Sequence, residues 1–210
     1  MGNKSLVHLN NNLMCAIDLE TTGRVPGYHE ILQLAIIPLD NWLEPRKDLP
    51  LFDIFMRPNH LDRIDMESLE ITKLELHNVI TRGIDPEKAR ELFEHWYSKL
   101  NIPDNKRIVP LGFGIAMFDV PFLIHWLEHS LYQTYFHGFP RDALLVANYL
   151  NDVADRHVET VPFPKFKLKE IARALGIEVF DSETHAALYD AYIAAEVYKK
   201  LLSHDLLNPV

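Results

Sequence analysis

The 210-residue sequence has one cysteine, Cys15, no long apolar run and no excess of basic residues. A single cysteine excludes an intrachain disulfide and a zinc site built from several thiolates. No apolar stretch approaches the roughly 18 residues of a membrane helix, so we expect no membrane-spanning segment and no membrane partner. Residues 1–12 are polar and lack the apolar core of a signal peptide. We therefore predict a flexible N-terminal segment and a cytoplasmic protein.

The formal net charge of −9 at pH 7 bears directly on possible partners. An acidic surface repels phosphate, which argues against binding nucleic acid through a basic face. The objection weakens where several carboxylates hold divalent cations, because bound metal can make an acidic pocket attract phosphate. A nucleic-acid enzyme of this composition therefore needs clustered carboxylates.

The order of apolar and helical segments predicts an α/β fold. Three short apolar runs near the start favour an antiparallel meander of strands, and a fourth strand follows later. These strands are expected at residues 13–19, 30–39, 51–56 and 108–113. Helices are expected at residues 66–79, 85–100, 120–127, 141–150, 168–175 and 185–202, with surface loops at 133–140 and 151–164. We predict one domain, residues 1–210, with a mixed central sheet flanked by helices.

Two acids end the first predicted strand. Asp18 and Glu20 are two residues apart, so strand alternation places both side chains on the same face. Buried together, they repel each other and lose hydration unless a proton or a cation neutralises them. A divalent metal with oxygen ligands would serve. Solvated acids at a fraying strand end remain the alternative for this pair alone.

Two further acids lie near the starts of helices. Asp119 follows the fourth strand and precedes a helix, where aspartate commonly caps the N-terminus. Asp190 has only apolar neighbours at three and four positions either way on the last helix, so it projects from the packing face. A carboxylate there needs a metal, an arginine or a proton. A buried structural salt bridge is the alternative.

His185 lies five residues before Asp190, a spacing that puts them on different faces of an ideal helix. We expect His185 in the first turn, capped by Thr184 or Ser182, with its ring over the acidic site. A histidine with a near-neutral pKa suits deprotonation of water. Taken alone, it equally suits an exposed surface position.

Together these segments resemble the DEDDh exonucleases, the group that includes the proofreading subunit of bacterial replicative polymerases. The sequence DLETTG at 18–23 resembles their first motif, GFGIAMFDVPFL at 112–123 their second and HAALYDA at 185–191 their third. RDAL at 141–144 and LKEIA at 168–172 resemble connecting segments. The motifs occur in the family's order over about residues 13–202. The second motif departs from the pattern, because Phe113-Gly114 stands where the family usually has His-Asn.

The resemblance implies a ribonuclease-H-like fold and 3′-to-5′ hydrolysis with two Mg²⁺ or Mn²⁺ ions. Asp18 would bridge both ions, Glu20 and Asp190 would complete one site, and Asp119 would hold the other. His185 would act as general base. The substrate would be the 3′ end of single-stranded nucleic acid, DNA rather than RNA. Its predicted contacts are Leu19, Thr21, Thr22 and Phe113, the last by stacking on a base.

Other readings remain open at this point. An RNA-trimming or oligoribonuclease-type enzyme shares the same residues. A non-catalytic nucleic-acid-binding subunit would explain the altered second motif, and a scaffold with surface acids would explain the acids without metal. A polymerase partner or a homo-oligomer cannot be read from the sequence.

Overall fold

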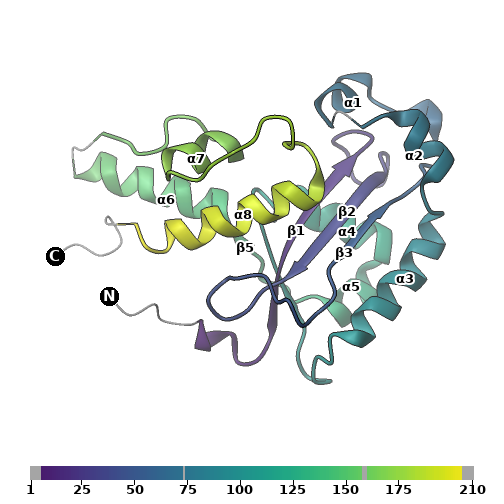
Figure 1. The fold of residues 1–210 in the computed structure, drawn as a ribbon, viewed down its shortest axis with the longest axis horizontal. Helices are drawn as coiled ribbons and strands as arrows, with labels where there is room; N and C mark the ends of the chain where they lie inside the picture. The colour runs from purple at the N-terminus through teal and green to yellow at the C-terminus, as the bar shows by residue number, and fades with distance from the viewer. Residues whose placement is uncertain (1–5, 73, 158–159, 205–210) are drawn as a thin grey trace.

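The computed structural model describes residues 6–72, 74–157 and 160–204. Its centre is a five-stranded sheet in the order β3-β2-β1-β4-β5 (Figure 1). The strands are β1 (Leu13–Thr21), β2 (Ile31–Pro38), β3 (Phe52–Phe55), β4 (Ile108–Gly112) and β5 (Arg141–Asp142). β1, β2 and β3 form an antiparallel meander, whereas β4 runs parallel to β1 and β5 parallel to β4. The predicted mixed sheet is confirmed.

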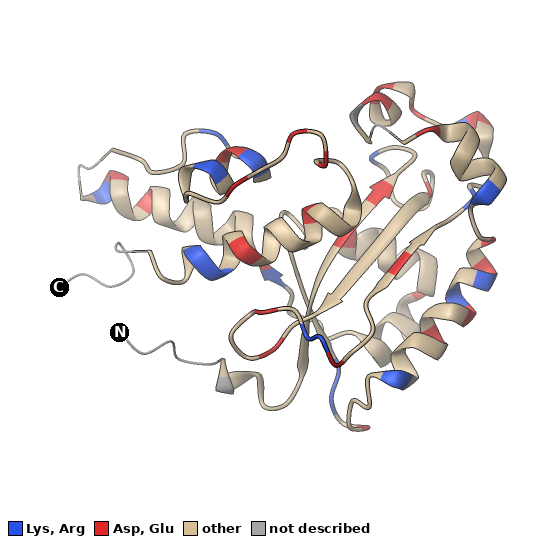
Figure 2. Cartoon of the chain, viewed as in Figure 1, with Lys and Arg blue, Asp and Glu red and all other residues tan. Residues whose placement is uncertain are grey.

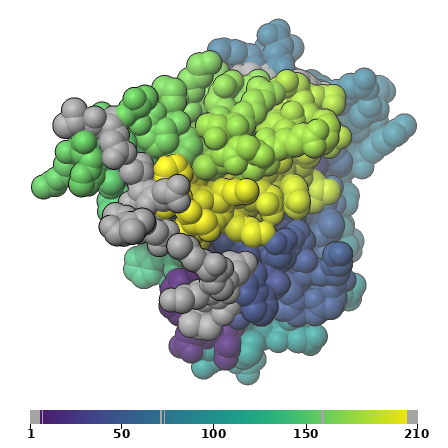
Figure 3. Space-filling view, turned by 60° about the vertical axis from the view of Figure 1, so that its left-hand side comes forward, coloured from purple at the N-terminus to yellow at the C-terminus, as the bar shows by residue number. Residues whose placement is uncertain are grey.

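Helices cover both faces of this sheet (Figure 1). Those packed on one face are α3 (Pro86–Lys99), α4 (Asp119–Leu127) and α5 (His129–Tyr135), and those on the other are α6 (Ala143–Arg156), α7 (Leu168–Ala174) and α8 (Ala187–Leu201). Two short helices, α1 (Met66–Thr72) and α2 (Leu76–Arg82), follow the 3-10 turn η2 (Leu61–Arg63). In Figure 3, α8 (yellow) lies between the green α6–α7 layer and the blue segment around β2.

Successive side chains of β1 point to opposite faces of the sheet, and each face has its own hydrophobic core. Met14 and Ala16 belong to the cluster beneath α6–α8, whereas Cys15, Ile17 and Leu19 belong to the cluster beneath α3–α5. Even-numbered residues of β1 therefore face α8. Asp18 and Glu20 continue this row, which places two carboxylates on the face that α8 covers.

The predicted helix over 66–79 is wrong in its continuity, since α1 and α2 are separate. The Thr72 hydroxyl donates to the Leu69 carbonyl and accepts the Leu74 N–H, a side-chain interaction that competes with helix hydrogen bonding. Leu69 and Val79 still share a small core with Leu32 of β2. The spacing of apolar residues in this segment therefore reflects their packing into this core and does not require one continuous helix.

Both predicted loops contain helix. α5 reaches Tyr135 because Tyr132 and Phe136 stack on each other in an aromatic core around Phe93. α6 runs on to Arg156, where Asn151 had suggested a loop. The Asn151 amide is buried and bonds both the N–H and the carbonyl of Phe163, so its polar groups are satisfied inside the fold.

The ends of the chain are only partly described. Of the predicted flexible segment, residues 1–5 lie outside the described residues. Val7–Leu9 form the 3-10 turn η1, and Leu9 is buried in the core beneath α6–α8. No helix in the described part of the chain is both long and apolar enough to span a membrane.

Candidate active site

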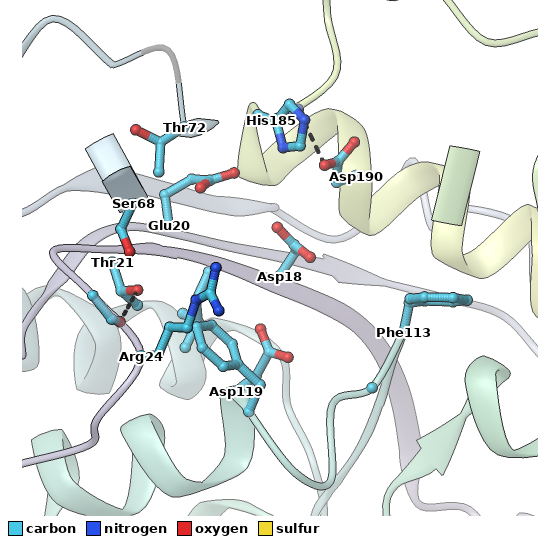
Figure 4. Close-up of a pocket in the computed structure, with 14 residues that line it drawn as sticks. Asp18, Glu20, Thr21, Arg24, Ser68, Thr72, Phe113, Asp119, His185 and Asp190 are labelled. Atoms are coloured by element: carbon cyan, nitrogen blue, oxygen red, sulfur yellow. Dashed lines mark hydrogen bonds between the residues drawn. The ribbon is translucent and has the colours of Figure 1, made fainter. Parts of the chain in front are cut away.

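A pocket of about 380 Å³ opens at the carboxyl end of β1 (Figure 4). It is lined by β1 and the turn after it, by α1, by the β4–α4 loop, and by the start of α8. The lining residues are Asp18, Leu19, Glu20, Thr21, Gly23, Arg24, Ser68, Thr72, Phe113, Gly114, Phe118, Asp119, His185 and Asp190. The four acids and the histidine singled out from the sequence are therefore brought together.

Asp18 and Glu20 both point into this pocket from β1 (Figure 4). Asp18 pairs with Ala35 and Glu20 with Gln33 across β2, so regular strand geometry fixes both Cα positions. The register shift comes only after Glu20, at Thr21. Glu20 is buried and Asp18 is half-buried. The two acids therefore project from the regularly paired part of β1.

The histidine prediction is corrected in its local structure. α8 begins at Ala187 with Ala186 at its N-cap, so His185 precedes the helix instead of occupying its first turn. Ala186 makes no side-chain cap bond, and the Thr184 hydroxyl donates to the Asp181 carbonyl. The His185 backbone N–H donates to the Asp190 carboxylate at 3.1 Å. Leaving the helix allows His185 and Asp190 to face the same pocket despite their five-residue spacing.

Asp119 occupies the first turn of α4, but it is not the N-cap. Phe118 holds that position and makes no side-chain cap bond. The Asp119 carboxyl is 4% exposed and accepts its own backbone N–H and that of Leu19. The second of these bonds ties α4 to β1. Asp119 therefore enters the pocket from the face opposite α8.

The acids raise one another's pKa values. Burial raises the pKa of Asp18 well above its ordinary value, and the charges of Asp119, Glu20 and Asp190 add to the effect. Burial, followed by repulsion from Asp190 and Asp119, raises the pKa of Glu20 to about 9. Burial raises the pKa of Asp119 to about 8 against two backbone hydrogen bonds that lower it. Such clustering needs protons or cations to be tolerated.

The donor set fits a hard divalent cation. Carboxylate oxygens are the ligands that Mg²⁺ and Mn²⁺ prefer. Among the described residues, ligand atoms of Glu20, His185 and Asp190 lie within 4.8 Å of one another. Asp18 and Asp119 fall outside that tight group but interact electrostatically with its acids. The pocket thus contains one three-residue candidate site with two further carboxylates beside it.

The turn after β1 gives its two threonines different surroundings. Thr21 lines the pocket, and its hydroxyl donates to the Gly23 carbonyl at 2.6 Å. Thr22 is fully buried, and its hydroxyl accepts the Glu30 N–H. The Thr22 side chain therefore holds the turn together, and its contact with a substrate stays a prediction. Leu19 lines the pocket, although its side chain belongs to the core beneath α3–α5.

The altered second motif forms one wall. Phe113 lines the pocket and also packs against the core beneath α6–α8. Gly114 adopts φ +71°, a conformation that glycine reaches without strain. Its N–H donates to Asp142 at 2.8 Å, and Ala116 donates to the same carboxylate at 3.3 Å. The loop before Asp119 is thus anchored to the N-cap of α6.

Sequence reasoning missed four residues around the site. Asp142 was noted only as part of a connecting segment, although an aspartate before a helix is a recognisable cap signal. Arg24, Ser68 and Thr72 also line the pocket. No motif marks them, because α1 and the turn after β1 meet only in the folded chain.

Comparison with known proteins gives the same assignment. Residues 15–198 match the model of the RNase T family, described as exonuclease. The 3′-5′ DNA exonuclease Cap18 of Escherichia coli is 26% identical over 189 residues, covering 89% of this chain and 90% of that protein. A PolC-type DNA polymerase III of Ureaplasma parvum is 22% identical over 209 residues, or 96% of this chain, which spans only 12% of the polymerase.

Solved structures show the same fold at low identity. E. coli exonuclease I in complex with a 5cy-dT13 oligonucleotide gives a TM-score of 0.70 at 19% identity, covering 94% of this chain and 42% of that one. The cell-death related nuclease CRN-4 gives a TM-score of 0.65 at 15% identity, and the match covers 91% of this chain and 64% of that one. The ribonuclease-H-like fold and the DEDDh resemblance are both confirmed. The chain belongs to the RNase T exonuclease family and is a hydrolytic nuclease.

Proposed function

We propose that the protein removes nucleotides from the 3′ end of single-stranded DNA, with two Mg²⁺ or Mn²⁺ ions held in the acidic pocket. The observation that carries this proposal is the convergence of Asp18, Glu20, Asp119 and Asp190, since burial and mutual repulsion raise the pKa of Asp18 and Glu20. Four carboxylates this close are stable as anions only with counter-charge. Divalent cations provide this positive counter-charge at the pH where the acids must be ionised to bind them.

The residues of the pocket have separate proposed roles in binding the cations and in proton transfer. Asp18 is positioned between the other acids and is proposed as a shared ligand, with Glu20 and Asp190 on one side and Asp119 on the other. When bound, two cations stabilise negative charge on the attacking and leaving oxygens of the phosphodiester. His185, adjacent to Glu20 and Asp190, is proposed to accept a proton from the attacking water.

The polarity and the choice of DNA rest on relatives. Cap18 is a 3′-5′ DNA exonuclease, and exonuclease I has been solved with a dT13 oligonucleotide. The pocket of about 380 Å³ lies at the carboxyl end of β1, and α1 contributes Ser68 and Thr72 to its wall (Figure 4). A walled pocket of this size suits a strand terminus better than the middle of a strand.

A degradation assay on end-blocked strands tests this function. Single-stranded DNA and RNA oligonucleotides of one sequence are prepared free, 3′-blocked or 5′-blocked, and incubated with Mg²⁺, Mn²⁺ or a chelator. We expect metal-dependent release of mononucleotides from free and 5′-blocked DNA only. Faster loss of RNA would favour an RNA-trimming enzyme. No degradation of any strand with either metal would favour the non-catalytic binding subunit and refute the proposal.

A further inference from the structure

One cationic side chain of the pocket has no role in the proposed reaction. Arg24 is the only lysine or arginine among the described residues that line the pocket. The residue is exposed, and its guanidinium points toward the acids (Figure 4). None of the ion pairs within the described part of the chain includes it. It is therefore available to a ligand that enters the pocket.

The backbone that carries Arg24 is held on both sides. Gly23 accepts the Thr21 hydroxyl at 2.6 Å, and the Val25 N–H donates to His29 Nδ1 at 3.0 Å. A Cβ at Gly23 would lie 2.2 Å from the His29 ring, so any other residue there would have to displace that ring. The turn therefore presents Arg24 from a defined backbone position, and only its side chain has freedom to adapt.

The neighbouring polar side chains have engaged their donors. The Ser68 hydroxyl donates to Asp65, and the Thr72 hydroxyl donates to the Leu69 carbonyl. Arg24 instead offers a planar fork of N–H donors, which matches the oxygens of a phosphate. A nucleic-acid strand carries further phosphates besides the one that is cleaved. Apart from Arg24, the charged side chains of the pocket are acids, which repel these phosphates. Positive charge in addition to the metal cations is therefore needed beside these phosphates.

We propose that Arg24 binds a backbone phosphate of the substrate strand and thereby sets the affinity of this acidic protein for single-stranded nucleic acid. This inference rests on the proposed nuclease function. A phosphate contact differs from recognition of a base. Its loss weakens the binding of strands of every sequence alike and reduces the salt dependence of binding.

The test measures equilibrium binding of a labelled single-stranded oligonucleotide in Mg²⁺ at several salt concentrations. All variants carry His185→Asn so that the strand is consumed only slowly during the measurement, and asparagine tolerates the φ of +66° at this position. Arg24→Ala should weaken binding about tenfold to hundredfold and reduce the slope of log affinity against log salt by about 0.7. Arg24→Lys should keep the slope. Arg156→Ala removes an exposed arginine outside the pocket and should change neither quantity.

Each contrary outcome has a distinct meaning. Unchanged affinity and slope in Arg24→Ala, with the His185→Asn parent binding normally, would overturn the inference and leave the nuclease function standing. Weakening confined to strands with one terminal base would also overturn it, because Arg24 would then contact a base. If the parent binds no strand and the wild type degrades none, the proposed function itself fails.

Discussion

His185 adopts a left-handed backbone conformation, φ +66°, at the junction between a turn and α8. Non-glycine residues rarely occupy this region, and such strain concentrates at functional sites. Here the conformation directs the His185 backbone N–H to Asp190 while its ring reaches the acids. One backbone turn thus orients the proposed base and a proposed metal ligand together.

Replacing His185 by asparagine should separate proton transfer from metal binding. We expect turnover to fall by about 10²- to 10⁴-fold, the usual contribution of a general base, while Mg²⁺ still raises the melting temperature. Single-turnover degradation and thermal melts of the same preparation measure the two effects. A variant with normal turnover would exclude His185 as the base, and loss of the metal effect would instead make it a ligand.

The residue identities of the site were predictable because strand periodicity, apolar surroundings and motif order each constrain them. Two-residue alternation places Asp18 and Glu20 on one face of the strand, and the ordered motifs assign them to the candidate site. The position of the His185 ring over the acids was expected, but its backbone was not, because His185 precedes α8 instead of lying in the first turn of the helix. The burial of Thr22 was not predictable, because the sequence does not show whether a hydroxyl faces the pocket or closes a turn.

At the scale of elements, Asp142 links α6 to the loop that positions Asp119. Its carboxylate accepts three backbone N–H groups, from Gly114, Ala116 and Leu144, and is only 7% exposed. The bond from Leu144 caps α6, whereas the other two hold the loop between β4 and α4. A single side chain therefore supports a helix and one wall of the pocket.

Asp142→Ala should therefore cost both stability and activity. Loss of a cap and of two partly buried acceptor interactions predicts destabilisation of about 2–4 kcal/mol. Denaturant unfolding measures this, and degradation assays at a temperature where the variant stays folded should show reduced turnover. Asp152→Ala, at an exposed position of the same helix, is the matched control. Equal stability of the two variants would rule out the anchoring role.

The sheet was more predictable than the helix boundaries. β1 and β2 are apolar runs buried on both faces, a signal that survives without tertiary information. α5 and the end of α6 depend on distant partners, namely the Phe93 cluster and the backbone of Phe163. Local propensity at these places was overridden by packing that the sequence does not display.

At the scale of the whole molecule, charge is distributed unevenly. The acids of β1 and the first turns of α8 gather on one side of the sheet, whereas lysines and arginines lie mostly on peripheral helices and loops (Figure 2). The net charge of −9 is therefore concentrated in part where the substrate must enter. Binding should be weak and sensitive to salt unless cations occupy the acidic pocket.

The raised pKa values make metal-free stability depend on pH. The pKa of Glu20 is about 9 and that of Asp119 about 8 in the folded chain, both above their ordinary values near 4. The folded state therefore binds more protons than the unfolded state across this range, and stability falls as pH rises from about 4 to about 9. Cations bind the ionised acids, so their stabilising effect should grow over the same interval.

The most direct measurement compares melting temperatures of the wild type and Asp18→Asn, each with Mg²⁺ and with chelator, at about pH 6 and about pH 8. Mg²⁺ at a hundred times its dissociation constant at pH 6 should stabilise the wild type by about 2.7 kcal/mol at that pH, and the same Mg²⁺ concentration should stabilise it more at the higher pH. Asp18→Asn should melt at or above the metal-free wild type at pH 8 and show little response to Mg²⁺. A wild type that Mg²⁺ does not stabilise at either pH, or a variant that responds equally, would contradict the metal-binding role of the four acids.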